Sequence, residues 1–426
     1  MAERVVRLDS GLTVAVDEMA STRSASIGVW VGVGSRDEPD QSSGVSHFLE
    51  HLLFKGTDRR SARDISRSVD RVGGDINAYT AKEHTVFHCR VPARHIAESI
   101  EILGDVVCRP AIRGDDVDSE RQVILEELAM DDDSPEDVVF REFTAAVFAG
   151  HPLGRDTAGE RETVSQMTPD AVRSFHADRY RAESMVVSVA GGVDVDEVIG
   201  LVDRAFAPVA TGAATHDRHR PGGLGADRHL ADDTEQVHLV FGGRSIARTD
   251  GDREVLDIVN HVLGGGLSSR LFDEIRERRG LAYSVFSSMS GFDDCGLWSV
   301  YAGSQPSSAP AVRDLIEAEC GRLLADGITD EELDDAKGFL QGAFELGLED
   351  SGARMSRLGG SLTLLDGIVP VDEQLARWAR VDHDDIGRVV DRVFGGERVA
   401  VSLGPIGPRA SGWGSGLASS LWTVVR

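Results

Sequence analysis

Cysteine and lysine are scarce in this chain of 426 residues, and long apolar runs are missing. The four cysteines are widely spaced and form no Cys-x-x-Cys pair, which argues against a disulfide framework and against a zinc site made of thiolates. No apolar run reaches the ~18–20 residues that a membrane-spanning helix needs, so an integral membrane protein is not expected. The composition is otherwise ordinary for a globular enzyme, with 41% hydrophobic and 27% charged residues.

Positive charge is also in deficit. The chain has three lysines, and its formal net charge is −27. A surface of this sign repels phosphate backbones, so a nucleic-acid partner is not expected. The first residues, MAERVVRLDSGLTVAV, are charged early and are typical of a strand, unlike the apolar centre of a signal peptide. We therefore expect a cytoplasmic protein that binds neither nucleic acid nor a membrane.

The length predicts two domains, because one core seldom extends over so many residues. A segment rich in Gly, Ala, Pro and charge, Pro208–Leu230, lacks apolar periodicity and is typical of a linker. The predicted domains are residues 1–210 and 230–426, joined by a linker over 211–229.

The two halves repeat a similar order of elements. Each has an apolar strand near its start, Ala25–Gly34 in the first half and Gln236–Gly243 in the second, followed by a helical segment, hairpin-like strands and long helices. Such an uneven alternation predicts an α+β fold with antiparallel-rich sheets packed with helices, and not regular βαβ units. We interpret the halves as two homologous domains that arose by duplication.

A helix over residues 44–54 would have two distinct faces. His47, Glu50 and His51 fall on one face, where two imidazoles at i and i+4 can hold one metal ion and the glutamate can take a proton from water. This His-x-x-Glu-His pattern arises by chance only about 0.03 times in such a composition. The opposite face gathers Val45, Phe48, Leu49, Leu52 and Leu53.

A third ligand is needed, because catalytic zinc takes three protein ligands and a water. The acidic helical segment Asp116–Asp132 places Glu120, Ile124 and Glu127 on one face, together with Val123. Its Glu126 falls on the other side and is expected to be solvated. Spacing alone does not choose between Glu120 and Glu127.

These motifs together resemble the pitrilysin/insulysin zinc peptidases. The inverted zinc motif HFLEHLLFKGT is followed by VGGDINAYTAKEHT, by ERQVILEELAMDDDSPED and, in the second half, by GGGLSSRLFDEIRERRGLAYSV. Their order and distances are similar to those of the bacterial branch that resembles mitochondrial processing peptidase. The resemblance covers nearly the whole chain, and it implies two homologous domains that face each other as a clamshell.

The resemblance also implies roles for single residues. It assigns one zinc ion per chain to His47, His51 and Glu127, with Glu50 as the catalytic base. It makes Glu120 a catalytic residue that supports the site without binding the metal.

Further positions are implied to contact substrate. Asn77 and Ala78 match an edge strand that pairs with the substrate backbone. Arg276 and Tyr283 match an arginine–tyrosine pair of the second domain that contacts substrate.

The second half provides a comparison with the first. Aligning His51 with His261 places Asn260 at the position of the base and Asp257 at the position of the first ligand. We therefore expect the second domain to lack a metal site, and His261 to be a packed or hydrogen-bonded residue. The glycines from 264 to 266 are expected to end that helix.

The expected function is a zinc-dependent metalloendopeptidase that hydrolyses peptides or unfolded polypeptide segments, with metal-activated water and a glutamate base. By resemblance it would act as a homodimer, or as a heterodimer with a related chain. One alternative is a non-catalytic partner subunit of a heteromeric peptidase, although the intact motif residues argue against it. Another is a maturation protease dedicated to one ribosomally made peptide, which differs in substrate and not in chemistry.

Overall fold

The computed structural model describes residues 3–365, 367–405 and 423–425, and the chain divides into two compact units. Each unit contains a six-stranded sheet with helices packed on it, which confirms the predicted α+β fold with two sheet-containing domains. The ends of the predicted domains, at residues 1 and 426, lie outside the described residues. Unit 1 comprises Met1–Ala129, Arg155–Arg218 and Phe344–Val369, and unit 2 comprises Met130–Gly154, His219–Ala343 and Pro370–Arg426.

The units are discontinuous in the sequence. The change at Arg218 and His219 falls inside the predicted linker. However, residues 130–154 of the first half belong to unit 2, and residues 344–369 of the second half belong to unit 1. The predicted domains, 1–210 and 230–426, do not include this reciprocal exchange. The composition of a linker does not indicate which hydrophobic core a distant helix packs against.

The sheet of unit 1 has the strand order β1-β2-β6-β3-β5-β4. All its neighbours are antiparallel except β2 and β6, which are parallel. The inner strands β3 and β6 are almost wholly buried, in keeping with their mostly apolar sequences, in which valine is frequent. The strands are β1 (Glu3–Arg7), β2 (Thr13–Glu18), β3 (Ser24–Val31), β4 (Asp75–Thr80), β5 (Thr85–Pro92) and β6 (Met185–Gly191).

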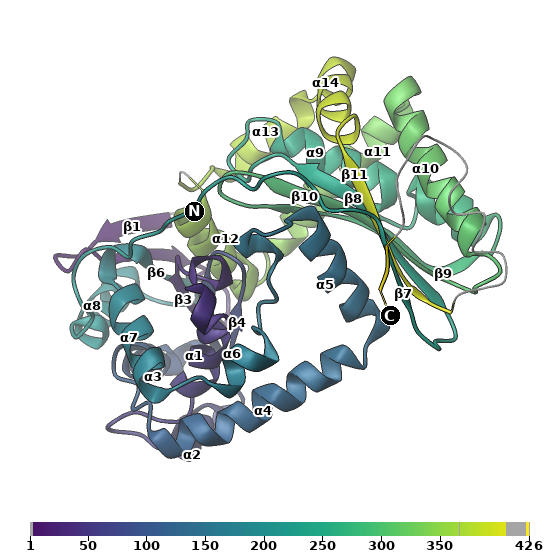
Figure 1. The fold of residues 1–426 in the computed structure, drawn as a ribbon. Coiled ribbons are helices and arrows are strands. Elements are labelled where there is room, and N and C mark those ends of the chain that lie inside the picture. The colour runs from purple at the N-terminus through teal and green to yellow at the C-terminus, as the bar shows by residue number, and fades with distance from the viewer. Residues whose placement is uncertain (1–2, 366, 406–422, 426) are drawn as a thin grey trace. The chain divides into compact units, whose positions relative to one another are not determined.

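Both faces of this sheet are covered. Successive residues of a strand point to opposite faces, and on β3 Val29 joins the main core while Trp30 packs with Met355 of helix α12 (Ser351–Leu364). Helix α12 thus lies along β3 and β6 (Figure 1), although it comes from the second half of the sequence. The other helices are α1 (Val45–Leu53), α2 (Ala62–Asp70), α3 (Ile96–Cys108), most of α4 (Gly114–Asp132), α6 (Arg161–Ser165), α7 (Pro169–Arg179) and α8 (Val195–Phe206).

The sheet of unit 2 has the order β12-β7-β11-β8-β10-β9. Helix α5 (Pro135–Val147), from the first half of the sequence, packs on β8 and β11 (Figure 1). Its strands are β7 (Arg228–Ala231), β8 (Val237–Ser245), β9 (Ala282–Gly291), β10 (Gly296–Ser304), β11 (Arg398–Gly404) and β12 (Thr423–Val425). Its other helices are α9 (Arg253–Asn260), α10 (Ala309–Asp326), most of α11 (Asp330–Gly347), α13 (Val371–Arg380) and α14 (His383–Phe394).

The two sheets repeat one topology. The order β2-β6-β3-β5-β4 in unit 1 corresponds to β7-β11-β8-β10-β9 in unit 2, and in both cases the first two strands are parallel. Helices α5 and α12 also occupy corresponding positions, because each follows a long helix and packs on the sheet of the unit that the other half of the chain builds. The repeated topology therefore includes an exchange of these two helices between the units.

No helix in the described part of the chain is long and apolar enough to cross a membrane.

Short helical turns connect the longer elements. The 3₁₀ turns are η1 (Ser35–Asp37), η2 (Asp40–Ser42), η3 (Ala93–His95), η4 (Pro152–Gly154) and η5 (Ala182–Ser184), and the π-helical turns are η6 (His261–Gly265) and η7 (Phe272–Glu277).

Candidate metal centre

Helix α1 has the apolar and polar faces that its spacing predicts. His47, Glu50 and His51 are only partly buried and lie on the polar face. The helix begins after Gly44, whose φ of 92° lies in the left-handed region that glycine adopts without strain. The buried face consists of Val45, Phe48, Leu49, Leu52 and Leu53.

Helix α4 presents glutamates to α1. The Glu120 side chain is 3% exposed and that of Glu127 is 40% exposed, whereas Glu126 belongs to the exposed class. The predicted helix phase therefore places these three carboxylates correctly. Val123, which the helix phase places on the same face, is 38% exposed, so this face is only partly buried at that position.

Three candidate ligands converge within unit 1. Glu127 Oε2 is 3.5 Å from Nε2 of His51 and 3.9 Å from Nε2 of His47. One ligand atom from each residue lies within 4.8 Å of the other two, and this is the one such group among the residues that the structure describes. Helical spacing alone did not choose between Glu120 and Glu127 as the third ligand. In the tertiary structure it is Glu127 that lies near the Nε2 atoms of both His47 and His51.

The donor set fits zinc. Two imidazoles and one carboxylate form a His₂Glu set, which is typical of catalytic zinc sites. Burial, together with the charge of His51, lowers the pKa of His47 to about 4. Its imidazole is therefore neutral at pH 7, which is the form that binds a metal.

Glu120 contacts the far side of one candidate ligand. Its Oε2 is 3.1 Å from Nδ1 of His51, and its Oε1 is 2.5 Å from the ammonium of Lys55. A hydrogen bond from Nδ1–H to this carboxylate leaves Nε2 of His51 unprotonated, so that its lone pair can bind a metal. Lys55 compensates the charge of the buried carboxylate.

Glu50 is held by a strand. Its Oε2 accepts a 2.6 Å hydrogen bond from the hydroxyl of Thr80, the last residue of β4. Burial raises the pKa of Glu50, although the bond from Thr80 opposes the shift. A carboxylate whose pKa moves towards neutrality is a better acceptor and later donor of a proton.

Strand β4 is the edge of the sheet of unit 1. Its Asn77 and Ala78 pair with His88 and Phe87 of β5 on one side, and β4 stands last in the strand order. The side chain of Asn77 is exposed and accepts the N–H of Ala78. The edge is therefore available among the described residues for pairing with another strand.

The predicted arginine–tyrosine pair forms within unit 2. The guanidinium of Arg276, in η7, lies 4.5 Å from the ring centroid of Tyr283 and 4.7 Å from that of Phe272. Tyr283, on β9, is 78% exposed. Their proximity to each other is thus established, and their approach to the centre in unit 1 stays a prediction.

Sequence reasoning missed two residues of this centre, Lys55 and Thr80. Helix α1 ends at Leu53 and Lys55 lies just beyond it, so helical spacing did not indicate the contact of Lys55 with Glu120. Thr80 had no local signal, because only the packing of α1 against β4 brings it to Glu50.

Comparisons with known proteins identify the family of the chain. The family model described as Insulinase (Peptidase family M16) matches residues 13–161, and the model described as Peptidase M16 inactive domain matches residues 166–340. An uncharacterized zinc protease of Streptomyces coelicolor is 42% identical over 411 residues, which are 95% of this chain and 90% of that protein. An uncharacterized zinc protease of Bacillus subtilis is 32% identical over 400 residues, which are 93% of this chain and 97% of that protein.

A solved structure extends this likeness. The crystal structure of a protease from Helicobacter pylori is 25% identical and has a TM-score of 0.90, covering 95% of this chain and 99% of that one. Both halves of the sequence match, the relatives span nearly the full length, and the fold agrees. The chain therefore belongs to the insulinase family of peptidases, M16.

Proposed function

We propose that this protein is a zinc-dependent metalloendopeptidase that hydrolyses peptides or unfolded polypeptide segments. The convergence of His47, His51 and Glu127, with Glu50 beside them on the same helix, carries the proposal. The names of the relatives, which call them zinc proteases, support it.

His47, His51 and Glu127 would hold one zinc ion per chain. A zinc ion there supplies Lewis acidity, which polarises a substrate carbonyl and lowers the pKa of water. Glu50 accepts the proton of the attacking water through its carboxylate and then donates it to the leaving amine. Thr80 holds the carboxylate of Glu50 in place, and Glu120 keeps the ring of His51 oriented.

The substrate would bind as an added strand. The free side of β4, at Asn77 and Ala78, offers backbone donors and acceptors to an extended peptide, and such β-augmentation tolerates many side chains. Arg276 and Tyr283 would contact the same peptide from unit 2. This mode requires an extended chain, so compact folded proteins would be poor substrates.

Assembly belongs to the same proposal. We propose a homodimer, or a pair with a related chain, in the cytoplasm and without a nucleic-acid or membrane partner. Size-exclusion chromatography with light scattering of the purified protein measures the assembly directly.

A peptide library tests the function. Purified protein is incubated with the library, with and without a zinc chelator, and the products are mapped by mass spectrometry. We expect internal cuts that the chelator abolishes and that added Zn²⁺ restores. Cuts that persist without metal would contradict a zinc mechanism, and a metal-loaded protein that makes no cuts would favour the partner-subunit alternative.

A further inference from the structure

Three consecutive charged residues, Arg36, Asp37 and Glu38, lie buried between β3 and α1 in unit 1. Their exposed fractions are 4%, 9% and 5%. A buried charge is costly unless partners compensate it. Each of the three has polar partners, which lie in three different parts of the unit, although burial still raises the pKa of Glu38 to about 7.

Glu38 binds the first turn of α1. Its Oε2 accepts the N–H of Gly44 at 2.7 Å, and its Oε1 accepts the N–H of Ser46 at 2.7 Å. These N–H groups have no partner within the helix, so one carboxylate satisfies two donors and faces the positive end of the helix. The next residue after Ser46 is His47.

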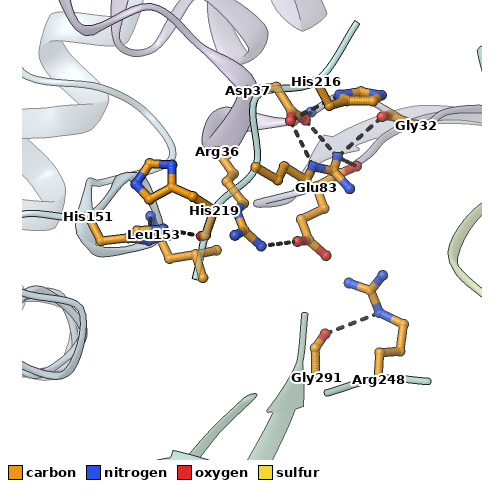
Figure 2. Close-up of polar contacts among 12 residues, drawn as sticks. Gly32, Arg36, Asp37, Glu83, His151, Leu153, His216, His219, Arg248 and Gly291 are labelled. Atoms are coloured by element: carbon orange, nitrogen blue, oxygen red, sulfur yellow. Dashed lines mark hydrogen bonds and ion pairs between the residues drawn. The ribbon is translucent and has the colours of Figure 1, made fainter. Parts of the chain in front are cut away.

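Asp37 binds the segment that leaves unit 1. Figure 2 shows its carboxylate facing His216, whose Nδ1 lies 3.1 Å from Oδ1. Arg218 donates to both oxygens at 2.8 Å, and its Nη2 also donates to the carbonyl of Glu83. Although burial by itself raises it, these hydrogen bonds lower the pKa of Asp37 to about 2.

Arg36 binds the turn that follows β4. Its guanidinium forms a 2.7 Å ion pair with Glu83 (Figure 2). Both side chains are almost fully buried. Its backbone N–H donates to the carbonyl of Lys82 at 2.7 Å. The segment from 36 to 38 therefore joins the linker, the β4–β5 turn and α1.

The two candidate histidine ligands differ in their support. Glu120 orients His51, whereas Nδ1 of His47 is buried without a hydrogen-bond partner. With no side-chain partner on that nitrogen, the direction of the His47 ring depends on where the backbone of α1 begins. Glu38 fixes that point.

We infer that Glu38 is a positioning residue of the metal centre, which orients His47 through the first turn of α1, and that Asp37 and Arg218 hold Glu38 in place. The inference rests on the proposed zinc function. It differs from simple helix capping because it predicts an effect on the metal that is separate from stability.

Glu38→Gln tests the role of the carboxylate. The amide keeps the size, but only its oxygen can accept, and its NH₂ group opposes an N–H donor. We expect zinc affinity, measured by competition with a chromophoric chelator, to fall roughly tenfold or more, as when other groups that orient metal ligands are removed. The visible spectrum of the Co²⁺-loaded variant should also change, because it reports ligand geometry.

Asp64→Asn is the matched control. Asp64 accepts the N–H of Ser61 at the start of α2, which contributes no candidate ligand. We expect zinc affinity to change by about twofold or less, because the site is independent of that helix. An unchanged affinity in Glu38→Gln, or equal losses in both variants, overturns the role of Glu38.

Arg218→Lys tests the linker contact independently, and remains informative if Glu38→Gln does not fold. Lysine keeps the charge but cannot donate to both oxygens of Asp37 as the guanidinium does. We expect zinc affinity to fall by roughly threefold to tenfold, since the effect passes through Asp37. Arg181→Lys is the control, because Arg181 donates to the linker carbonyl of Thr211. Equal affinities in the two lysine variants overturn the linker contribution.

The readouts separate this inference from the proposed function. Zinc affinity and the Co²⁺ spectrum require no turnover. If the wild type binds zinc and cuts no peptide, the proposed function fails while the role of Glu38 is still measured. If peptides are cut and Glu38→Gln binds zinc as tightly as the wild type, only the role of Glu38 fails.

Discussion

Helix α1 of unit 1 and helix α9 with η6 of unit 2 occupy corresponding positions, each after the strand at the centre of its sheet, β3 or β8. In unit 1 the polar residues of the helix face one another and Glu127. In unit 2 the corresponding side chains contact other side chains of the same unit. Asp257 Oδ2 accepts a 3.2 Å hydrogen bond from the indole of Trp378, and the ring of His261 stacks on Phe339 with centroids 4.1 Å apart.

The backbone differs in the same way. Helix α1 stays α-helical through His51, whereas α9 ends at Asn260 and His261 begins a π-helical turn. Asn260 Oδ1 accepts the hydroxyl of Ser287 at 2.7 Å. A helix at this position thus serves packing where its polar groups bind protein partners. It offers a metal site where two ring nitrogens and a carboxylate converge. The prediction that His261 is a packed residue is confirmed.

The largest expected effect comes from replacing the carboxylate of Glu50 with an amide, the group that Asn260 carries at the corresponding position of unit 2. Glu50→Gln should retain one zinc per chain and lose peptide hydrolysis by orders of magnitude, because an amide cannot accept the proton of water. Elemental analysis beside a peptide assay measures both properties, with Glu126→Gln as the control. Retained turnover would remove Glu50 from the mechanism, and loss of zinc would make it a ligand.

Glu127 is the third candidate ligand beside α1, and removing its carboxylate should weaken metal binding. Glu127→Gln should weaken zinc binding by more than about 100-fold, because a neutral amide is a poor ligand and the loss exceeds that of a supporting group. Glu126→Gln should leave zinc binding unchanged, since that residue is exposed. Comparable losses in the two variants would contradict the helix phase of α4.

Substitutions of Arg276 and Tyr283 test whether unit 2 contributes to catalysis without binding zinc. Tyr283→Phe should leave zinc content unchanged and lower kcat by roughly 10²–10³, if the hydroxyl stabilises charge that develops on the substrate carbonyl. Arg276→Ala should also leave zinc unchanged and lower kcat/KM. A rise in KM alone would instead indicate uniform binding of substrate. Wild-type kinetics of both variants on several peptides would reduce unit 2 to a scaffold.

The smallest expected effect concerns His261, the residue of unit 2 that aligns with His51. His261→Ala should lower the stability of the protein by about 1–2 kcal/mol, because it removes an aromatic contact and leaves a small cavity. Zinc content and kcat should not change. Urea unfolding and metal analysis measure these quantities. A loss of zinc on this substitution would show that unit 2 does bind metal.

Much of the centre could be predicted from local sequence. The pattern of His47, Glu50 and His51 requires only a helix, and the apolar face of α1 shows that the helix forms. The strands β3, β4, β5 and β8 also follow from short apolar or alternating runs. Local patterns did not reveal that α5 and α12 exchange units, because both helices are amphipathic and the pattern does not specify which sheet receives their apolar faces.

The sequence by itself determined the candidate metal-binding motif, since two imidazoles and a glutamate on one helical turn depend only on helical periodicity. The tertiary structure decided the rest. It chose Glu127 over Glu120 for the Nε2 atoms, brought Thr80 to Glu50 and placed Glu38 under the start of α1. The physical reason is distance along the chain: these contacts join residues that are not neighbours on one helix, so the packing of α1, α4 and the sheet against one another fixes them.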